Sequence, residues 1–184
     1  MTTTFKAKTR SLVVVGGLLL LMGLAFTSVV QAASLTNAEK YWLTYMREEE
    51  KLARDVYLVL YDKWRLAIFS NISQSEQTHM DAIRTLLDRY GLPDPAKAEV
   101  GAFTDPALQA AYDKLIAQGS VSDVEALKAG VTIEETDIDD LGVAIDAATR
   151  KDIKTVYNNL LQGSLNHLKA FVSNLAKYGV TYEP

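Results

Sequence analysis

The sequence contains no cysteine. This absence excludes disulfide bonds, thiolate metal sites, cysteine nucleophiles and lipid anchors on cysteine. It also excludes an internal rubredoxin-like iron centre, because such centres hold their iron with cysteine thiolates. Histidine is nearly absent as well: only His79 and His167 are present, so any imidazole chemistry must use these two side chains.

The chain also has no excess of positive charge. Its net charge is −4, and without the three basic residues among the first ten it becomes −7 (−4 − 3). A basic face for nucleic acid is therefore excluded, and we expect no nucleic-acid partner. An acidic chain suits the attraction of cations, although many soluble proteins are equally acidic.

The first 32 residues have the pattern of a secretory signal peptide. Lys6, Lys8 and Arg10 precede an uncharged, apolar stretch over 11–30, and Ala32 ends a small-residue cleavage site. We predict cleavage after Ala32, which leaves a mature domain of residues 33–184 without a stable membrane anchor. The mature protein would then be exported, to the periplasm or the extracellular space. The alternative is an uncleaved anchor, since the apolar stretch is long enough to span a membrane.

The rest of the chain shows long helical patterns and no convincing strand. Four long helices are predicted at about 37–64, 73–90, 122–148 and 150–178, with a short helix at 106–118. A loop of moderate length joins the first two, almost nothing joins the last two, and a long crossover at 91–120 joins the pairs. This layout predicts an all-α fold, a ferritin-like four-helix bundle with a long crossover between helices two and three.

Each long helix has an apolar stripe at alternating spacings of three and four, which identifies its core-facing side. Polar residues interrupt every stripe, and they are Glu50, then Glu76 with His79, then Glu134, then Ser164 with His167. Burying an unpaired carboxylate costs several kcal/mol, so these groups need compensation. A pair of divalent cations would supply it, with carboxylates bridging the ions and imidazoles completing their coordination.

The spacing Glu76-x-x-His79 places a carboxylate and an imidazole on one helix face. It is half of the di-iron carboxylate pattern, which has a Glu on each of two helices and Glu-x-x-His on each of the others. Ser164 stands where a further Glu is expected, and Asp137, one turn after Glu134, is the predicted substitute. The predicted metal ligands are Glu50, Glu76, His79, Glu134, Asp137 and His167. Oxygen and imidazole ligands favour iron or manganese, and we expect two ions.

Four runs of sequence, at 48–57, 75–80, 133–138 and 163–167, carry a family resemblance. They resemble the ferritin-like family catalogued as domain of unknown function 2202, over essentially all of the mature chain. The resemblance implies the ferritin-like fold and a metal site, but no established reaction. Ser164 is similar to that family and differs from ferritins and rubrerythrins. A single metal, or two unlike sites, is therefore an alternative to a symmetric di-iron site.

Three functions fit these features. The first is an exported oxidoreductase whose iron reacts with dioxygen or peroxide. The second is a metal-binding protein without catalysis, and the third is a structural or partner-binding helical bundle. The expected partners are metal ions and dioxygen or peroxide, and the sequence also allows a homo-oligomer.

The individual glutamates have alternative interpretations. Glu76 could close a capping box with Ser73, three residues before it. The run Glu48, Glu49 and Glu50 could be a solvated face, and only the stripe selects Glu50. Glu49, on the neighbouring stripe, is the reserve ligand.

The two histidines have an alternative as well. Instead of binding a metal, His79 and His167 could belong to a buried hydrogen-bond network with Tyr57, Tyr157 and Asn166. The two tyrosines are expected to be packing residues with satisfied hydroxyls.

Overall fold

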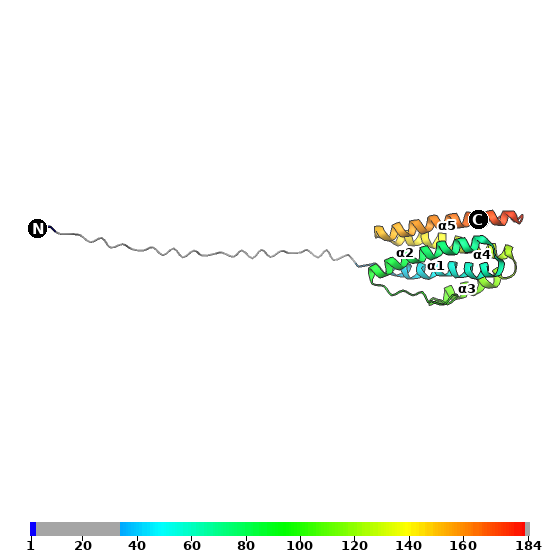
Figure 1. Cartoon of the computed structure of the whole chain (residues 1–184), viewed down its shortest axis with the longest axis horizontal. Helices are drawn as coiled ribbons and strands as arrows, with labels where there is room; N and C mark the ends of the chain where they lie inside the picture. Colours follow the sequence, from blue (N-terminus) through cyan, green and yellow to red (C-terminus); the bar gives the residue numbers. More distant parts are fainter. Residues whose placement is uncertain (3–33, 183–184) are drawn as a thin grey trace. The chain divides into compact units, whose positions relative to one another are not determined.

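A computed structural model describes residues 1–2 and 34–182 (Figure 1). The cleavage site and nearly all of the predicted signal peptide lie outside these residues. Residues 34–182 fold into helices without any strand, which confirms the all-α class. The helices are α1 (Asn37–Trp64), α2 (Ala67–Tyr90), α3 (Pro106–Gly119), α4 (Asp123–Ala147) and α5 (Lys151–Lys177). Within that range, no helix is both long and apolar enough to cross a membrane.

The start of α1 has a capping box. The Thr36 hydroxyl accepts from the Glu39 amide at 3.1 Å, and the Thr36 amide donates to Glu39 Oε2 at 2.9 Å. The other oxygen of Glu39 accepts from the Thr149 amide and hydroxyl, both at 2.8 Å, and from the Arg150 amide at 3.1 Å. One carboxylate therefore ties the beginning of α1 to the α4–α5 junction.

The connection between α1 and α2 is much shorter than predicted. Only Arg65 and Leu66 separate the helices, so the expected loop of moderate length is wrong. Arg65 takes a left-handed conformation (φ 55°), and its amide donates to the Tyr61 carbonyl. This single residue in the αL region ends one helix and lets the next begin almost at once.

As a result, α2 begins six residues before the predicted start at 73. The polar residues there do not interrupt the helix, because a side chain such as that of Ser73 donates to a carbonyl of the same helix, that of Ser70, at 3.0 Å. Phe69 is fully buried and extends the core stripe backwards. Glu76 lies in the third turn of α2, so its interpretation as part of a capping box is wrong.

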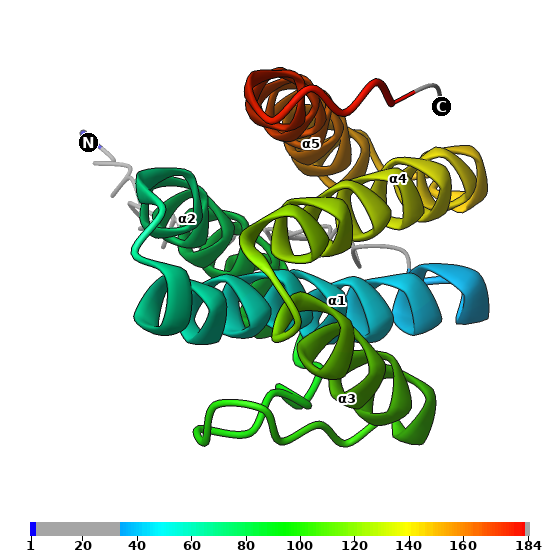
Figure 2. The same ribbon diagram turned by 90° about the vertical axis from the view of Figure 1, so that its right-hand side faces the viewer.

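The long segment between α2 and α3 lies against α1, on the side away from α5 (Figure 2). A buried ammonium holds it there: Lys51 Nζ contacts Asp55 Oδ2 at 2.5 Å and donates to the carbonyls of Glu99 at 2.9 Å and Ala102 at 3.1 Å. Asp55 Oδ2 also accepts from the Gly101 amide at 2.9 Å. These bonds anchor the middle of the segment to α1.

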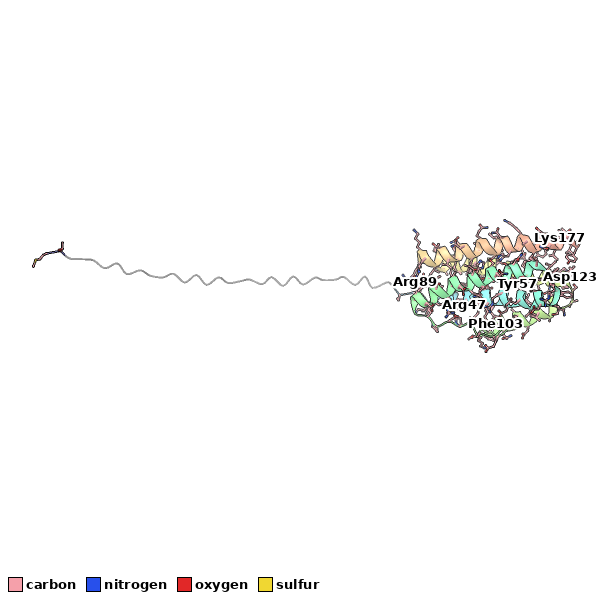
Figure 3. All side chains as sticks on the ribbon, in the orientation of Figure 1. Arg47, Tyr57, Arg89, Phe103, Asp123 and Lys177 are labelled. Atoms are coloured by element: carbon pink, nitrogen blue, oxygen red, sulfur yellow. The ribbon has the colours of Figure 1, made fainter. Side chains whose placement is uncertain are left out.

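The ends of the same segment have charged anchors too. The two oxygens of Glu48 accept from the amides of Thr104 at 2.6 Å and Asp105 at 3.0 Å. Arg47, labelled in Figure 3, forms a two-pronged ion pair with Asp94 at 3.0 and 2.9 Å. Side chains on one face of α1 thus bind this long connection along its length.

The apolar core is divided into two clusters. In one, Tyr57, Phe69 and Phe171 pack together; the other includes Leu43, Leu86 and Tyr157. Helices α1 and α2 pack side by side, as do α4 and α5, and α1–α4 and α2–α5 contacts join the two pairs. Along each of these four helices, the polar stripe residues come between the two clusters.

Candidate metal centre

The predicted ligands form a polar layer between the apolar clusters. Five of the six predicted ligands, at positions 50, 76, 79, 134 and 137, are buried, and the side chain of the sixth, His167, is 11% exposed. They come from four helices, one from α1, two from α2, two from α4 and one from α5. Because the groups belong to four different helices, only the tertiary fold brings them together.

The first group of ligand atoms belongs to Glu50, Glu76 and His79. Their nearest donor atoms lie within 4.8 Å of one another. His79 Nδ1 is 3.1 Å from Glu50 Oε2 and 2.8 Å from Glu76 Oε2. The imidazole therefore faces two carboxylates from two helices, a donor set that suits a divalent cation.

The second group belongs to Glu76, Glu134 and His167, again within 4.8 Å. His167 Nδ1 lies 2.8 Å from Glu76 Oε1 and 3.5 Å from Glu134 Oε2. Glu76 thus contributes one oxygen to each group. The two imidazole rings are nearly parallel, at 26°, with centroids 5.6 Å apart, so the two groups are adjacent and similar in composition.

Several of these atoms have no hydrogen-bond partner in the described part of the chain. Glu76 Oε1 and His167 Nδ1 lie 2.8 Å apart, but their orientation does not satisfy hydrogen-bond geometry. Glu50 Oε1 and Asp137 Oδ1 are also buried and unpaired. Leaving buried polar atoms unpaired is costly. A cation among them would satisfy these lone pairs, so the residues present fit a metal.

Asp137 is buried beside this layer but belongs to neither group of three. Its Oδ2 accepts from Ser164 Oγ at 2.5 Å, while Oδ1 has no partner among residues 34–182. The contact joins α4 to α5 at the position where the di-iron pattern expects a glutamate. Asp137 therefore brings a carboxylate from α4 next to the place that α5 leaves without one.

Neighbouring residues fix the two imidazoles. His167 Nε2 lies 3.0 Å from the Ser75 hydroxyl, so the outer nitrogen is hydrogen-bonded while Nδ1 faces the carboxylates. A Cβ on Gly163 would lie 2.6 Å from His79 Nε2, so this position must lack a side chain. Neither role was predicted from sequence; for Ser75, the available signal was its position four residues before His79 on α2.

Burial and mutual contacts shift the pKa values within the layer. Burial opposes the charge on both histidines, but the carboxylates outweigh it: Glu50 and Glu76 raise the pKa of His79 to about 11, and Glu134 and Glu76 raise that of His167 to about 9. Burial likewise opposes ionisation of Glu76, yet the two imidazoles lower its pKa to about 2. Without a metal, the two protonated imidazoles supply the positive charge beside these carboxylates. His79 and His167 must therefore lose their extra protons before they can bind a metal.

The remaining carboxyls respond differently. Burial, reinforced by Glu76, raises the pKa of Glu134 to about 8, and burial raises that of Asp137 to about 7. Burial and the neighbouring Asp137 also raise the pKa of Glu50 well above its usual range. The positive charge of two imidazoles is therefore insufficient to keep all of these buried carboxyls ionised.

Two alternative interpretations are wrong. The run Glu48, Glu49 and Glu50 is buried throughout, so it is no solvated face. The histidines contact carboxylates and Ser75 rather than the proposed network: Asn166 is exposed, and the Tyr157 hydroxyl has no partner in the described range. Only Tyr57 touches the layer, through a 2.6 Å bond from its hydroxyl to Glu134 Oε1.

The model of a protein family described as Uncharacterized protein domain (DUF2202) matches residues 39–184. The chain belongs to this family. The match includes all four runs that carried the resemblance and every residue of the polar layer. Membership in DUF2202 assigns no reaction, so the chemistry must be argued from the layer itself.

The chain is similar to "Uncharacterized protein MJ0754" of Methanocaldococcus jannaschii. The two are 51% identical over 162 residues, 88% of each chain. A crystal structure of this hypothetical protein superposes with a TM-score of 0.81 over 85% of our chain and 90% of the other. A DUF305 fragment from Deinococcus radiodurans has a TM-score of 0.61 at 13% identity, covering 79% of our chain and 99% of the fragment, and shows a shared fold alone.

Proposed function

We propose that this DUF2202 protein is an exported metalloprotein whose polar layer binds two iron or manganese ions and reacts with dioxygen or peroxide. The observation that carries the proposal is the position of Glu76. One of its oxygens lies with Glu50 and His79, and the other with Glu134 and His167. A carboxylate shared by two similar donor groups is suited to bridging two ions.

The proposal includes the ferritin-like four-helix bundle. The pairs α1–α2 and α4–α5 would be its two hairpins, and the segment containing α3 would be the long crossover. Glu-x-x-His on α2, Glu50 on α1 and Glu134 on α4 support this assignment, as does the imidazole on α5. Ser164 is the departure from the usual pattern, with Asp137 as the carboxylate beside it.

The ions would be held by Glu50, Glu76, His79, Glu134, Asp137 and His167. Bound iron would supply electrons to dioxygen or peroxide. The chain's own contribution is to hold the carboxylates and imidazoles in fixed orientations and to exclude water with the apolar clusters on both sides. Tyr57 donates to Glu134 Oε1 and thereby fixes that carboxylate.

The first experiment is metal analysis of the mature protein from its native compartment, with Glu76→Gln and His79→Ala beside it. We expect close to two iron or manganese ions per chain in the wild type, and loss from both variants. Asp88→Asn, an exposed acid on α2, is the matched control and should keep its metal. A wild-type protein that stays free of metal after anaerobic addition of Fe(II) or Mn(II) would contradict the proposal and favour a structural or partner-binding bundle.

Oxidation assays then separate catalysis from storage. Wild-type protein should oxidise Fe(II) under air or peroxide over many turnovers, and His79→Ala should not. Stable binding of the metal without oxidation would instead favour a sequestration protein.

A further inference from the structure

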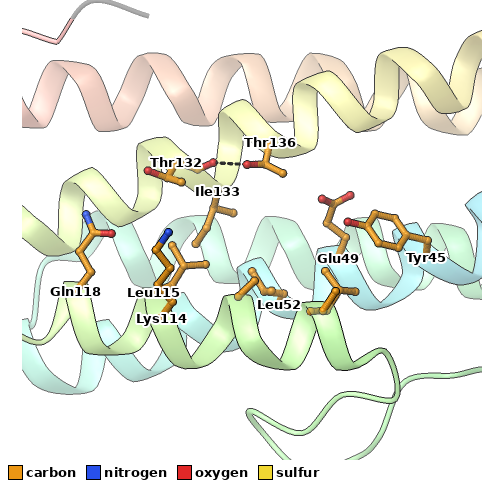
Figure 4. Close-up of a pocket in the computed structure, with 12 residues that line it drawn as sticks. Tyr45, Glu49, Leu52, Lys114, Leu115, Gln118, Thr132, Ile133 and Thr136 are labelled. Carbon is orange, nitrogen blue, oxygen red and sulfur yellow. Dashed lines mark hydrogen bonds between the residues drawn. The ribbon is translucent and has the colours of Figure 1, made fainter.

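Two pockets outside the polar layer border α1, and they differ in character. One lies between α1, α3 and α4, and most of its lining is apolar, including Leu52, Leu115 and Ile133 (Figure 4). The other, which we call the basic pocket, lies between α1, α2 and the segment that leads to α3. Its volume is about 370 Å³, within the range of small-molecule sites, and its lining is mostly polar and charged.

The charged side chains of the basic pocket are mostly cations. They are Arg47 and Arg54 from α1, Asp81 and Arg84 from α2, and Asp94 and Lys97 from the connecting segment. The chain as a whole is acidic, with a net charge of −4, so a group of four cations around one cavity is unusual for it. Whether they attract an anion depends on how far neighbouring carboxylates balance their charge.

Asp94 is shared by two of the arginines. Its oxygens accept from Arg47 Nε at 3.0 Å and Nη2 at 2.9 Å, while Arg84 Nε lies 4.0 Å from Oδ2. A single carboxylate therefore faces two guanidinium charges. The Arg84 side chain is 60% exposed, and this long contact is its one ion pair among the described residues. Its Nη1 and Nη2 groups are thus free to donate to a ligand.

Asp55, buried next to Arg54, is shared in the same way. Its carboxylate contacts Lys51 Nζ at 2.5 Å and accepts from Arg54 Nη2 at 2.6 Å. Lys97 Nζ donates to the Phe103 carbonyl at 2.8 Å, which leaves its charge unbalanced and two of its hydrogens available. With Lys51 and Asp55 included, five cations face three carboxylates, and the surroundings of the pocket carry a net charge of +2.

The hydrogen bonds at the pocket leave donors unpaired. Arg47 is 5% exposed, and its Nη1 has no hydrogen-bond partner among residues 34–182. Arg47 and Arg54 are largely buried and add positive charge from within the fold. Arg84 and Lys97 are exposed and offer accessible donors from two different walls. What the pocket lacks is therefore an acceptor that carries negative charge.

We propose that the basic pocket binds an oxyanion, a phosphate that is either free or part of a small molecule. A phosphate group carries about −1.5 to −2 charges at neutral pH, which matches the excess positive charge. Guanidinium and ammonium groups are its usual partners in proteins. Arg84 and Lys97 donate to the phosphate oxygens, and Arg47 and Arg54 supply positive charge behind them. No predicted metal ligand lines the pocket, so the site is independent of the metal function.

Calorimetry of the mature protein in a phosphate-free buffer tests the site with inorganic phosphate and acetate. We expect phosphate to bind at least about tenfold more tightly than acetate, because a dianion balances both excess charges. Equal affinity for the two anions, or no binding of phosphate, would overturn the proposal. Glycerol 3-phosphate then distinguishes the two sources: it should bind more tightly than inorganic phosphate if the ligand is a phosphorylated small molecule, and no more tightly if the ligand is free phosphate.

Three variants locate the binding. Arg84→Gln removes an accessible guanidinium and should weaken phosphate binding at least about tenfold without changing the melting temperature. Arg89→Gln, on the same helix but outside the pocket, is the matched control and should leave the affinity unchanged. Asp81→Asn removes a negative charge from the lining and should strengthen phosphate binding. Unchanged affinity in Arg84→Gln, or weaker binding in Asp81→Asn, would contradict the assignment.

A chelator separates this site from the proposed metal centre. Phosphate should bind equally well to the protein as purified and to the same protein after its metal is removed. Binding that disappears with the metal would be attachment to the metal itself and would overturn the proposal, whereas a protein that never holds metal but still binds phosphate would contradict only the proposed metal function.

Discussion

At the scale of single residues, the fold uses a few buried carboxylates for long-range connections. Glu39 is the clearest case, because its two oxygens accept from residues at the start of α1 and at the α4–α5 junction. Although its burial opposes ionisation, hydrogen bonds from Thr36 and Thr149 lower the pKa of Glu39 to about 2.

A pH-dependent loss of stability follows from Glu39. Since its pKa is lowered on folding, its contribution is present above the ordinary value near 4.5 and is lost as the pH falls toward 2. We expect Glu39→Gln to lower the free energy of unfolding at pH 7 by roughly 2–3 kcal/mol, and to remove this part of the acid dependence. Urea denaturation at pH 7 and pH 3 measures both effects; Asp139→Asn, on the exposed face of α4, is the control.

Gly163 makes a second residue-scale prediction. An alanine Cβ at this position would lie 2.6 Å from His79 Nε2, so the ring must move. We expect Gly163→Ala to keep the helical circular-dichroism spectrum but to weaken metal binding at least about tenfold, the loss typical when a ligand's orientation is disturbed. Gly142→Ala on α4 is the matched control, because a Cβ there meets nothing within 4 Å.

Ser75 should orient the other imidazole. Its hydroxyl lies 3.0 Å from His167 Nε2, and such outer contacts fix the tautomer that binds a metal. We expect Ser75→Ala to reduce metal affinity by about 10–100-fold, with little change in the stability of the metal-free protein. Thr78→Ala is the control, since that hydroxyl donates only to the Gln74 carbonyl of its own helix; equal affinities in the two variants would contradict the role of Ser75.

At the scale of elements, α1 holds the long connection through a buried ion pair. Lys51 and Asp55 are both fully buried. Removing the ammonium leaves Arg54 as the cation beside Asp55, but it takes the donor away from the carbonyls of Glu99 and Ala102. We expect Lys51→Met to destabilise the protein by about 2–3 kcal/mol and to speed proteolytic cleavage between 91 and 105. Lys40→Met, exposed on the same helix, should change neither quantity.

Helix positions were largely predictable from sequence, while the α1–α2 junction was not. Periodicity and capping residues gave α1, α3, α4 and α5 within a few residues of their observed ends. The predicted start of α2 is too late because Ser70, Asn71 and Ser73 look like a loop, whereas the buried Phe69 and Ile72 continue the stripe. The packing of these two side chains in the core outweighs the local polarity.

Most of the polar layer was predictable from the periodicity of the helices. A carboxylate or imidazole in an apolar stripe can be identified from spacing alone, so five of the residues now found within 4.8 Å in groups of three were selected from the sequence. The buried roles of Glu48, Glu49, Lys51 and Asp55 were not, because they depend on where the crossing segment and α3 lie against α1. Such contacts join residues about fifty positions apart and leave no periodic signal.

At the scale of the whole molecule, the arrangement of two apolar clusters around a charged layer predicts metal-dependent stability. Cations that bind the folded state alone stabilise it by an amount that grows with their concentration. We expect the melting temperature of the wild type to rise with Mn(II) concentration, and that of Glu76→Gln to stay constant. A parallel rise in both proteins would place the stabilising ions elsewhere on the acidic surface.

Glu48, Glu49 and Glu50 occupy one turn of α1, and each points about 100° further around the helix than the last. Glu48 anchors the connecting segment, Glu49 lines an apolar cleft between α1, α3 and α4, and Glu50 faces the polar layer. Inserting or deleting a single residue before this run would therefore misalign all three at once, whereas a substitution at one glutamate leaves the others in register. The protein can change these properties separately by point mutation, but any shift in helix register must compromise them together.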